Sequence, residues 1–409
     1  MSVSAPASPD LTVRRARLAV AALFFTNGAL FANLIPRYPE IKADLELSNA
    51  AYGLSVAAFP TGAILAGLAA GVLVRRFGSA TVAVTGTALT AVGVLLAGVA
   101  PTAVAFAAVL LLAGSMDAIT DVAQNEHGLR VQRRYGRSII NSFHAIWSIG
   151  AVTGGAMAAG AIALDLPRGV HLGSSGAVLA VVALVAWRFR LTGSEAAPPL
   201  PEDHQQQASA QRSAPGRRVW LIVGALTLIA MGGTLVEDAG NSWAAIYLSS
   251  SLQAAAATAA WGYIALVGAQ FVGRLLGDRL VDRFGQRAVA RAGSLVVVLG
   301  MGLALALPTT WGTILGFAAA GLGVATLVPA AMHEADELPG LRPGTGLTVV
   351  SWLMRLGFLL SPPIVGAVAD ATSLRAGLLV VPVAGLLVIL LAGVLRSRPA
   401  KPAAAPVPA

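Results

Sequence analysis

The sequence predicts an all-α membrane protein in which twelve transmembrane helices form two pseudo-symmetric six-helix bundles. Hydrophobic residues make up 56% of the 409-residue chain and charged residues only 11%, whereas a soluble domain carries about 25% charged residues. Twelve apolar stretches come close to or exceed the roughly 20 residues that a membrane-spanning helix needs. One polar segment separates the first six stretches from the last six.

Charged or turn-forming residues bound each apolar stretch and so define the expected helices. In the first half the helices cover 18–38, 50–74, 80–100, 103–126, 138–164 and 170–189. In the second half they cover 218–248, 257–277, 288–307, 310–331, 346–369 and 374–395. The first stretch is longer than the core of a signal peptide and no small-residue cleavage site follows it, so we expect it to be retained.

The polar segment 192–216 is rich in Pro, Gln and Ser and has no apolar periodicity, which is typical of a disordered linker. It is expected to join an N-terminal bundle at 18–191 to a C-terminal bundle at 217–396. The residues outside the bundles, 1–17 and 397–409, are expected to be cytoplasmic tails.

The distribution of basic residues predicts the orientation of the chain. With the N-terminus placed inside, 22 of the 28 Lys and Arg residues lie in inside segments and 4 in outside segments. Cytoplasmic loops carry such an excess, so both termini and the linker are expected in the cytoplasm, with the helices in the cytoplasmic (inner) membrane. The same loops account for the net charge of +9, and no nucleic-acid partner is expected.

The two halves of the chain are related at a constant offset. Four landmarks recur 207 residues apart, which is more than isolated coincidences explain. They are Arg76-Phe77-Gly78 with Arg283-Phe284-Gly285, Pro101 with Pro308, Gly150 with Gly357, and the small residues Gly154 and Ser361. A duplicated six-helix unit explains them best, and internal repeats are typical of secondary transporters.

Several chemistries are excluded by residue type. The chain has no cysteine, which rules out disulfides, thiol catalysis and Cys-bound metals. A P-loop requires Gly-Lys, but the only lysines, Lys42 and Lys401, follow Ile and Ala. We therefore expect no enzyme activity, no metal and no cofactor, with a proton gradient as the energy source. The expected partners are the lipid bilayer and a small-molecule substrate, and the chain is expected to be monomeric.

Two loops resemble a family signature. Gly71-Val-Leu-Val-Arg75-Arg76-Phe-Gly78 and Asp278-Arg-Leu-Val-Asp282-Arg283-Phe-Gly285 are similar to the two copies of the Gly-x-Leu-x-Asp-Arg-x-Gly loop of the major facilitator superfamily. This resemblance covers essentially the whole chain and implies that the loops gate the cytoplasmic side. The gating residues that it implies are Arg75, Arg76, Gly78, Asp278, Asp282, Arg283 and Gly285.

This signature is incomplete in both copies. Arg75 replaces the aspartate of the first copy, and Asp278 replaces the glycine with which the second copy should start. We therefore expect an asymmetric lock that depends on Asp282. The alternative is that these loops supply only topogenic charge and tight turns at Gly78 and Gly285.

Acidic residues within the fourth helix predict a site for proton coupling. Asp117, Asp121 and Asn125 are spaced by four residues and share one helix face. On the fifth helix, Asn141, His144 and Trp147 lie near one face, and the hairpin geometry places Asp121 and His144 at the same depth. A carboxylate beside an imidazole can exchange a proton near neutral pH. The alternatives are a structural ion-pair cluster at the cytoplasmic mouth and a packing histidine.

The pattern from Asp121 to Asn125 also resembles the fourth helix of the fucose-permease branch of the superfamily, where the acidic residue is implicated in proton and substrate handling. That branch also has an acidic residue on its first helix, whereas residues 18–38 here offer only Asn27, Asn33 and Arg37 as polar groups. Asp117 is the candidate for the missing role.

The second half contributes polar and aromatic residues on its first and fifth helices. Glu237, Asp238, Asn241 and Trp243 follow one another closely, and Trp352 and Arg355 lie inside a later apolar run. A buried charge in a membrane normally faces a cavity or a partner, so Arg355 is expected to be buried and to pair with a carboxylate or an anionic substrate. The alternative for the first group is an interfacial aromatic belt.

Together these residues predict a proton-coupled secondary transporter of a small polar or amphipathic organic solute, with a sugar-like substrate favoured. The alternatives are a proton-antiport exporter of drugs or toxic metabolites and a non-transporting membrane sensor or scaffold. The predicted proton-coupling residues are Asp117, Asp121, His144 and Glu237. The predicted cavity residues are Asn27, Asn33, Asn125, Asn141, Trp147, Asp238, Asn241, Trp243, Trp352 and Arg355.

Overall fold

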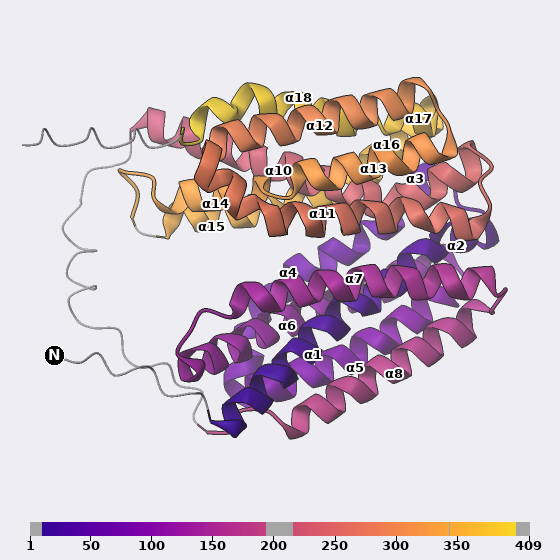
Figure 1. Ribbon diagram of the computed structural model, residues 1–409. Coiled ribbons are helices and arrows are strands. Elements are labelled where there is room, and N and C mark those ends of the chain that lie inside the picture. The colour runs from indigo at the N-terminus through magenta and orange to yellow at the C-terminus, as the bar shows by residue number, and fades with distance from the viewer. Residues whose placement is uncertain (1–9, 194–215, 343, 398–409) are drawn as a thin grey trace, which may run out of the picture.

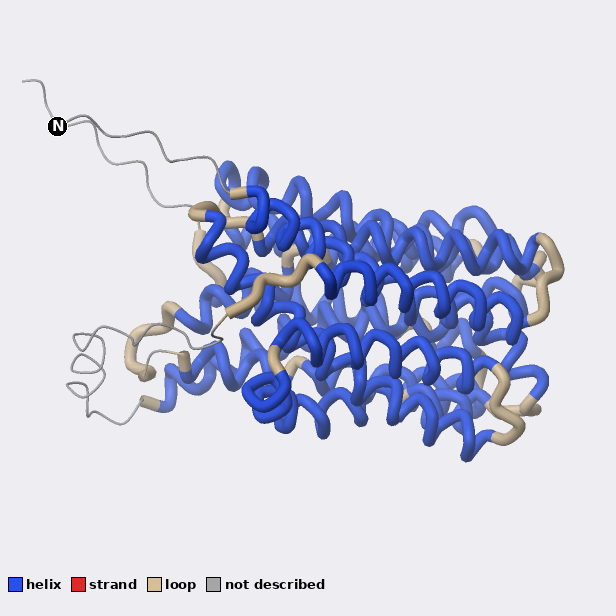
Figure 2. Tube along the Cα trace, turned by 90° about the horizontal axis from the view of Figure 1, so that it is seen from below, coloured by secondary structure: helices blue, strands red, loops and turns tan. Residues whose placement is uncertain are grey.

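The computed structural model describes residues 10–193, 216–342 and 344–397, and within these ranges the chain forms helices and turns without a β-strand. Twelve helical segments are long and apolar enough to cross a membrane, which confirms the predicted number. Figure 2 shows them side by side, with the connecting loops gathered at two opposite ends.

The N-terminal bundle consists of the first six spans. Its elements are α1 (Leu11–Leu34), η1 (Ile35–Arg37), α2 (Tyr38–Asp44), α3 (Asn49–Val56), α4 (Ala58–Phe77), α5 (Ser79–Gly98), α6 (Ala103–Tyr135), α7 (Ile140–Ala163) and α8 (Arg168–Arg188). The first span is formed by α1, η1 and α2, and the second by α3 and α4. Pro36 lies in the short 3-10 segment η1, because proline cannot donate the hydrogen bond that would continue the α-helix.

The C-terminal bundle consists of the last six spans. Its elements are α10 (Arg217–Ile246), the π-helical η2 (Tyr247–Ser251), α11 (Ala256–Phe284), α12 (Gln286–Ala306), α13 (Thr310–Val324), α14 (Leu327–Asp336), α15 (Thr345–Leu353), α16 (Arg355–Ala371), α17 (Leu374–Gly377), α18 (Val380–Leu391) and η3 (Ala392–Val394). The eleventh span is interrupted at Met354, between α15 and α16.

Helix ends differ from the sequence prediction where polar residues continue a helix beyond the apolar core. The first helix begins at Leu11 rather than near residue 18, so part of the expected tail 1–17 is helical. The fourth helix continues to Tyr135 rather than ending near residue 126, and Gly136, with φ of 72°, ends it. Of the expected linker 192–216 and the expected tail 397–409, residues 194–215 and 398–409 lie outside the described residues.

The repeat detected in the sequence is present in the structure. Gly78 and Gly285 end α4 and α11 with φ of 86° and 85°, in the left-handed region that favours glycine. The arginine two positions before each glycine lies over the ring of the intervening phenylalanine, at 5.3 Å and 5.2 Å. The two loops therefore share a tight turn, as expected for Gly78 and Gly285.

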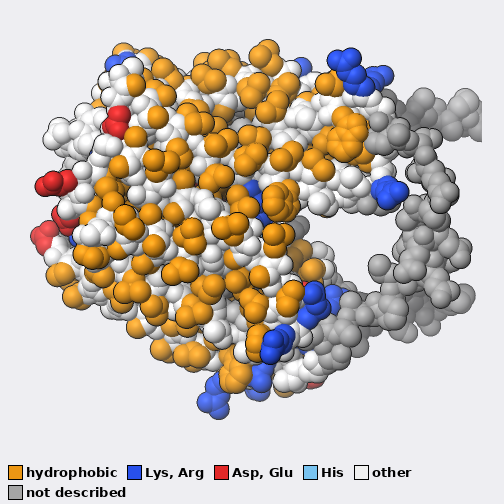
Figure 3. Space-filling model, turned by 180° about the vertical axis from the view of Figure 1, so that it is seen from behind, with side chains coloured by type: hydrophobic (Ala, Val, Ile, Leu, Met, Phe, Trp, Pro, Cys, Tyr) orange, Lys and Arg blue, Asp and Glu red, His pale blue; other side chains and the backbone are white. Residues whose placement is uncertain are grey.

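The two bundles touch at one end and are spread at the other (Figure 1). We call the spread end, where α1 and α10 begin and α8 ends, the linker end, and the opposite end, which includes α2 and the start of α3, the distal end. Figure 3 shows a deep hollow between the bundles that opens toward the linker end, where Lys and Arg side chains gather, while apolar side chains cover the flank. The space between the bundles is therefore open at the linker end.

Candidate functional site

A hydrogen-bond network joins three helices of the N-terminal bundle. Asn27 of α1 donates from Nδ2 to Asp117 Oδ1 of α6 at 2.8 Å. Its own Oδ1 accepts from Trp147 Nε1 of α7 at 2.8 Å and from Gln124 Nε2 at 3.4 Å. Gln124 also donates to Asp121 Oδ1 at 3.3 Å. Asn27 is thus the junction between residues that the sequence placed on separate helices.

The Asp121 end of this network faces the opening between the bundles. Asn125 Nδ2 donates to Asp121 Oδ1 at 3.0 Å, and the Asp121 side chain is exposed. Asp121 interacts electrostatically with His144 of α7 and, across the opening, with Arg355 of α16. Asp121 and His144 therefore lie within electrostatic range of one another, as the hairpin geometry predicts, and no hydrogen bond joins these two described side chains.

A second polar cluster lies on the C-terminal bundle. Gln270 Nε2 of α11 donates to Glu237 Oε2 of α10 at 2.7 Å, and Arg274 Nη2 lies 3.8 Å from the same oxygen. Arg274 Nη1 reaches across to Ser148 Oγ of α7 at 3.5 Å, and His144 lies within its electrostatic range. Arg274 therefore connects the two halves of a single polar belt. No role is predicted for this arginine from the sequence.

Arg355 departs from the prediction that it is buried. It begins α16 directly after the interruption at Met354, and its side chain is exposed, as is that of Trp352. A Cβ atom added at Gly67 of α4 would lie 4.0 Å from Arg355 Nη1. The separation of the bundles on the linker side explains the difference, because it leaves this arginine in the hollow rather than in a packed interior.

The other predicted cavity residues divide into two groups. Asn141 of α7 is exposed, and Asn241 of α10 is partly buried with its Oδ1 lacking a hydrogen-bond partner among the described residues. Asn33 is buried in the N-terminal bundle, where its Oδ1 lies 2.9 Å from His171 Nε2. Asp238 and Trp243 are also buried. Asn27 is likewise buried, at 6% exposed. The side chains of these four buried residues therefore do not line the opening in this state, which corrects their predicted placement.

Aromatic residues close the distal end beneath the belt. Tyr52 of α3 donates to the Ser242 carbonyl of α10 at 2.7 Å, and its ring meets the fully buried Trp243 edge to face at 4.9 Å. Tyr38 packs against Tyr52 at 5.7 Å and Phe106 at 6.3 Å. We call these side chains, together with Asp238, the distal seal. They separate the opening from the distal surface.

Close backbone contacts extend the distal seal between α3 and α16. A Cβ atom at Gly53 would lie 2.3 Å from the Pro362 carbonyl oxygen, and one at Gly366 would lie 2.3 Å from the Asn49 carbonyl oxygen. The Asp370 carboxylate accepts hydrogen bonds from the backbone N–H groups of Asn49 and Ala50 at 2.9 Å and 2.8 Å. It thereby caps the first turn of α3 from the other bundle.

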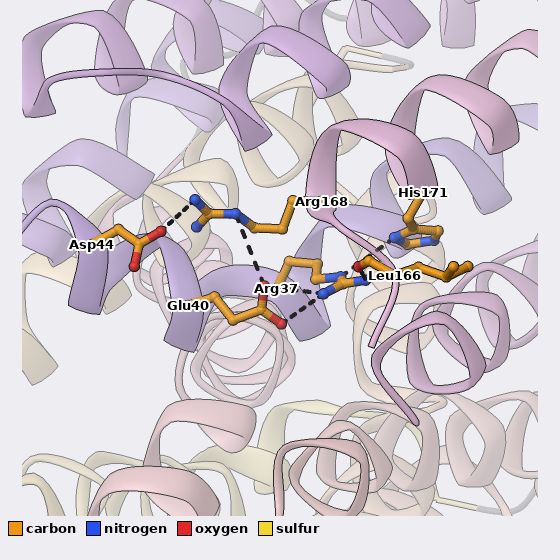
Figure 4. Close-up of polar contacts among 6 residues, drawn as sticks. All are labelled: Arg37, Glu40, Asp44, Leu166, Arg168 and His171. Carbon is orange, nitrogen blue, oxygen red and sulfur yellow. Dashed lines mark hydrogen bonds and ion pairs between the residues drawn. The ribbon is translucent and has the colours of Figure 1, made fainter. Parts of the chain in front are cut away.

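A charged cluster fixes the distal end of the first span (Figure 4). The buried Arg37 donates to both Glu40 oxygens at 2.7 Å and 3.0 Å, to the Leu166 carbonyl at 2.8 Å and to His171 Nδ1 at 3.4 Å. Arg168 pairs with Glu40 and Asp44. This cluster ties η1 and α2 to the α7–α8 turn, so the segment that carries Tyr38 is held to the N-terminal bundle.

Replacement of Arg37 with Ala is expected to destabilise the fold. The change leaves the Leu166 carbonyl and His171 without their donor, and loss of hydrogen bonds to a charged group costs about 1.5–3 kcal/mol. Arg37→Lys should recover only part of the loss, because lysine lacks the planar fork of five donors. Thermal denaturation in detergent measures the effect, with Arg14→Ala on the exposed face of α1 as control. Equal stability of both alanine variants would contradict a structural role.

The predicted gating residues lie at the linker end, where Gly285 is buried and Gly78 partly buried. Arg75, Arg76, Asp278, Asp282 and Arg283 are exposed, and neither aspartate forms an ion pair with another described residue. The ion pair between Arg396 and Glu334 at this end, 3.1 Å long, lies within the C-terminal bundle. The gating role of these loops stays a prediction, because the two bundles are apart here. Within the described ranges, no cluster of three His, Asp or Glu residues is placed to hold a metal ion.

Two repeated six-helix bundles, with a polar belt where they face one another, define a membrane transporter architecture. Residues 20–239 and 236–409 match the model of the Major Facilitator Superfamily, and the chain belongs to this superfamily. The recognition of the superfamily from the loop signature is thus confirmed.

Relatives of the chain include transporters and membrane proteins of bacteria. It is 28% identical to "Uncharacterized transporter y4wD" of Sinorhizobium fredii (strain NBRC 101917 / NGR234), over 92% of this chain and 97% of the relative. It is 29% identical to "Membrane protein MosC" of Rhizobium meliloti, over 90% and 88%.

Solved structures share the fold at low sequence identity. The nucleoside transporter NupG is 14% identical with a TM-score of 0.68, over 92% of this chain and 97% of that one. A D-xylose-proton symporter is 16% identical with a TM-score of 0.67, over 95% and 98%. A bacterial homologue of the human lysosomal transporter Spinster, in an inward-facing and unoccupied conformation, is 15% identical with a TM-score of 0.70, over 94% and 98%.

Proposed function

We propose that this protein moves a small polyhydroxylated solute across the membrane by alternating access and that a proton gradient drives the movement. The observation that carries this proposal is the polar belt. The network centred on Asn27 lies in the N-terminal bundle and the Glu237–Arg274 cluster in the C-terminal bundle, and Arg274 connects the two bundles through Ser148 Oγ of α7 at 3.5 Å.

The composition of the belt favours a sugar-like or nucleoside-like solute over an apolar one. Amide and carboxylate groups offer the paired donors and acceptors that hydroxyl groups require, and Trp147, held by its bond to Asn27, offers a ring face. The fold neighbours include proteins named for nucleosides and for D-xylose. The Asp121-to-Asn125 pattern supports membership of the fucose-permease branch, which stays a prediction.

Proton coupling is proposed for the carboxylates of the belt. Asp117 has one hydrogen-bond donor, Asn27, and no ion pair among the described residues. A carboxylate in such a position can alternate between charged and neutral forms as its surroundings change. His144 and Glu237 extend the set of groups that can exchange a proton with it.

Orientation follows from the basic residues, which Figure 3 shows near the linker end. We propose that this end is cytoplasmic, in accordance with the excess of arginine there. The hollow then faces the cytoplasm, and the distal seal faces the outside.

A binding screen followed by transport tests this proposal. Sugars, nucleosides, organic acids and antibiotics are each added to purified protein, and the melting temperature is measured, because a ligand at 100 times its Kd stabilises the state that it binds by about 2.7 kcal/mol. Compounds that bind are then tested in proteoliposomes with and without a pH gradient. We expect stabilisation by a sugar or nucleoside and uptake that the gradient accelerates.

Two other outcomes favour the alternatives. Stabilisation by antibiotics alone, with gradient-driven efflux, would indicate an exporter of drugs or toxic metabolites. A ligand that binds but is never transported would indicate a sensor or scaffold.

A further inference from the structure

Asp238 lies in the distal seal rather than in the opening. Its side chain is 7% exposed on α10. The hydroxyl of Ser242 donates to its carboxyl oxygens, at 3.4 Å from each, and the Ser361 hydroxyl of α16, which donates to the Leu235 carbonyl at 3.3 Å, lies close by. Hydroxyl groups are therefore its partners.

No described cation faces this carboxyl. The titratable groups that face it from the surrounding elements are Tyr38 of α2, Tyr52 of α3 and Glu237 on α10 itself, with Tyr263 of α11 beyond Tyr38. All of these are neutral or negative. An ionised carboxylate buried without a cation is strongly unfavourable, and a group in that position takes up a proton instead.

Tyr38 supplies a second, independent sign that the closed seal withholds water. Its side chain is 1% exposed, and its hydroxyl has no hydrogen-bond partner among the described residues. This hydroxyl lies within electrostatic range of Asp238. Tyr52, whose hydroxyl donates to the Ser242 carbonyl, lies within electrostatic range of both groups.

We propose that Asp238 is a proton-binding site that is loaded when the distal end closes and emptied when that end opens. On opening, the O–H bond of the carboxylic acid breaks, the proton passes to water entering from the distal side, and the carboxylate remains on α10. Closing requires the reverse step. The proton enters and leaves on one side only, so this site senses the pH of the distal compartment and does not carry the proton across.

Because proton binding and closing of the distal end are coupled, the pH shifts the equilibrium between open and closed molecules in a definite direction. The closed state binds one more proton than the open state, so raising the pH favours opening of the distal end. For one proton, the ratio of open to closed molecules rises by at most about tenfold for each pH unit. This inference rests on the alternating access proposed above, but it needs no knowledge of the solute.

Distance measurements between spin labels test the proposal. The chain has no cysteine, so Ala43→Cys and Ala255→Cys place one label on each bundle at exposed distal positions. Without any solute, we expect the long-distance population of the wild type to grow as the pH rises. Asp238→Asn, a neutral group of the same shape, should remove this pH dependence and keep the distal end closed. Asp238→Ser gives the same test if the asparagine variant does not fold.

Two control variants make the result specific. Glu126→Gln removes an exposed carboxylate of α6 and should keep the pH dependence. Tyr52→Phe removes the bond to Ser242 and should favour opening at every pH while keeping the pH dependence. Wild-type pH dependence in both Asp238 variants would overturn the assignment to Asp238. A distal end that opens in no variant at any pH would instead overturn alternating access itself.

Discussion

Replacement of Asp117 with Asn is expected to abolish transport driven by a pH gradient while exchange of solute at equal pH continues. The side-chain oxygen of the introduced asparagine can still accept the hydrogen bond from Asn27, which is 2.8 Å long in the wild type. The geometry of the network is therefore retained, but the side chain can no longer bind and release a proton. Loss of coupling without loss of binding is the signature of a proton site.

Replacement of Asp121 with Asn is expected to have a different effect, which distinguishes the role of Asp121 from that of Asp117. Asp121 accepts from Gln124 and Asn125 and interacts with Arg355 across the opening. If it anchors Arg355 rather than a proton, Asp121→Asn should weaken solute binding and reduce exchange as well as gradient-driven uptake. A comparison of the two variants thus assigns one role to each residue.

Proteoliposomes provide both measurements. Uptake with an imposed pH gradient and counterflow without one are recorded for Asp117→Asn and Asp121→Asn. Glu126→Gln, which removes an exposed carboxylate of α6, is the control. Gradient-driven uptake at the wild-type rate in both Asp117→Asn and Asp121→Asn would exclude these carboxylates from coupling. A uniform loss of exchange in Asp117→Asn would show that Asp117 binds the solute instead.

The arrangement of the spans could be predicted from the sequence because it depends on local quantities. Apolar length sets the number of helices, and a fixed offset of landmarks reveals the repeat. The spacing of Asp117, Asp121 and Asn125 places them on one helix face, and Asn125 does bond Asp121. Such relations lie within a single helix and need no knowledge of its neighbours.

The contacts between helices could be predicted only in part. Asn27 was recognised as a polar residue of the first helix, but nothing in the sequence shows that it joins Asp117 to Trp147. The position of Arg274 could have been predicted from the sequence. It is a charged residue inside an apolar run, one helical turn after Gln270, and this spacing indicates that the two residues share a polar helix face. Gln124 is buried and bonded to two of the predicted residues, yet it differs from an ordinary helix residue only by these contacts.

The remaining differences between predicted and observed burial depend on the conformational state of the protein. Arg355 is exposed because the bundles are apart at the linker end, and Trp243 is buried because they meet at the distal end. Alternating access exchanges these two surroundings, so one sequence must satisfy both. A sequence pattern identifies a polar or aromatic residue inside a span, but the burial of that residue belongs to one state of the molecule.

A close contact between α3 and α16 at the distal end is the basis of the second prediction with a large expected effect. Gly366→Leu is expected to prevent the distal end from closing, because a Cβ atom there would lie 2.3 Å from the Asn49 carbonyl oxygen. That oxygen belongs to the backbone of α3, so the overlap is relieved only when α3 and α16 move apart. Overpacking costs about 1–3 kcal/mol, which corresponds to a shift of about 5- to 150-fold toward distal-open molecules.

Transport by Gly366→Leu should fall by a similar factor, since the cycle requires the distal end to close. Gly53→Leu should behave in the same way, because a Cβ atom there meets the Pro362 carbonyl oxygen of the opposite bundle at 2.3 Å. Gly224→Leu is the matched control, because Gly224 of α10 is exposed and no atom lies within 4 Å of its added Cβ. The Ala43 and Ala255 labels report the distal distance in each variant. If Gly366→Leu folds, transports at the wild-type rate and keeps the short distance, then α3 and α16 do not form the distal gate.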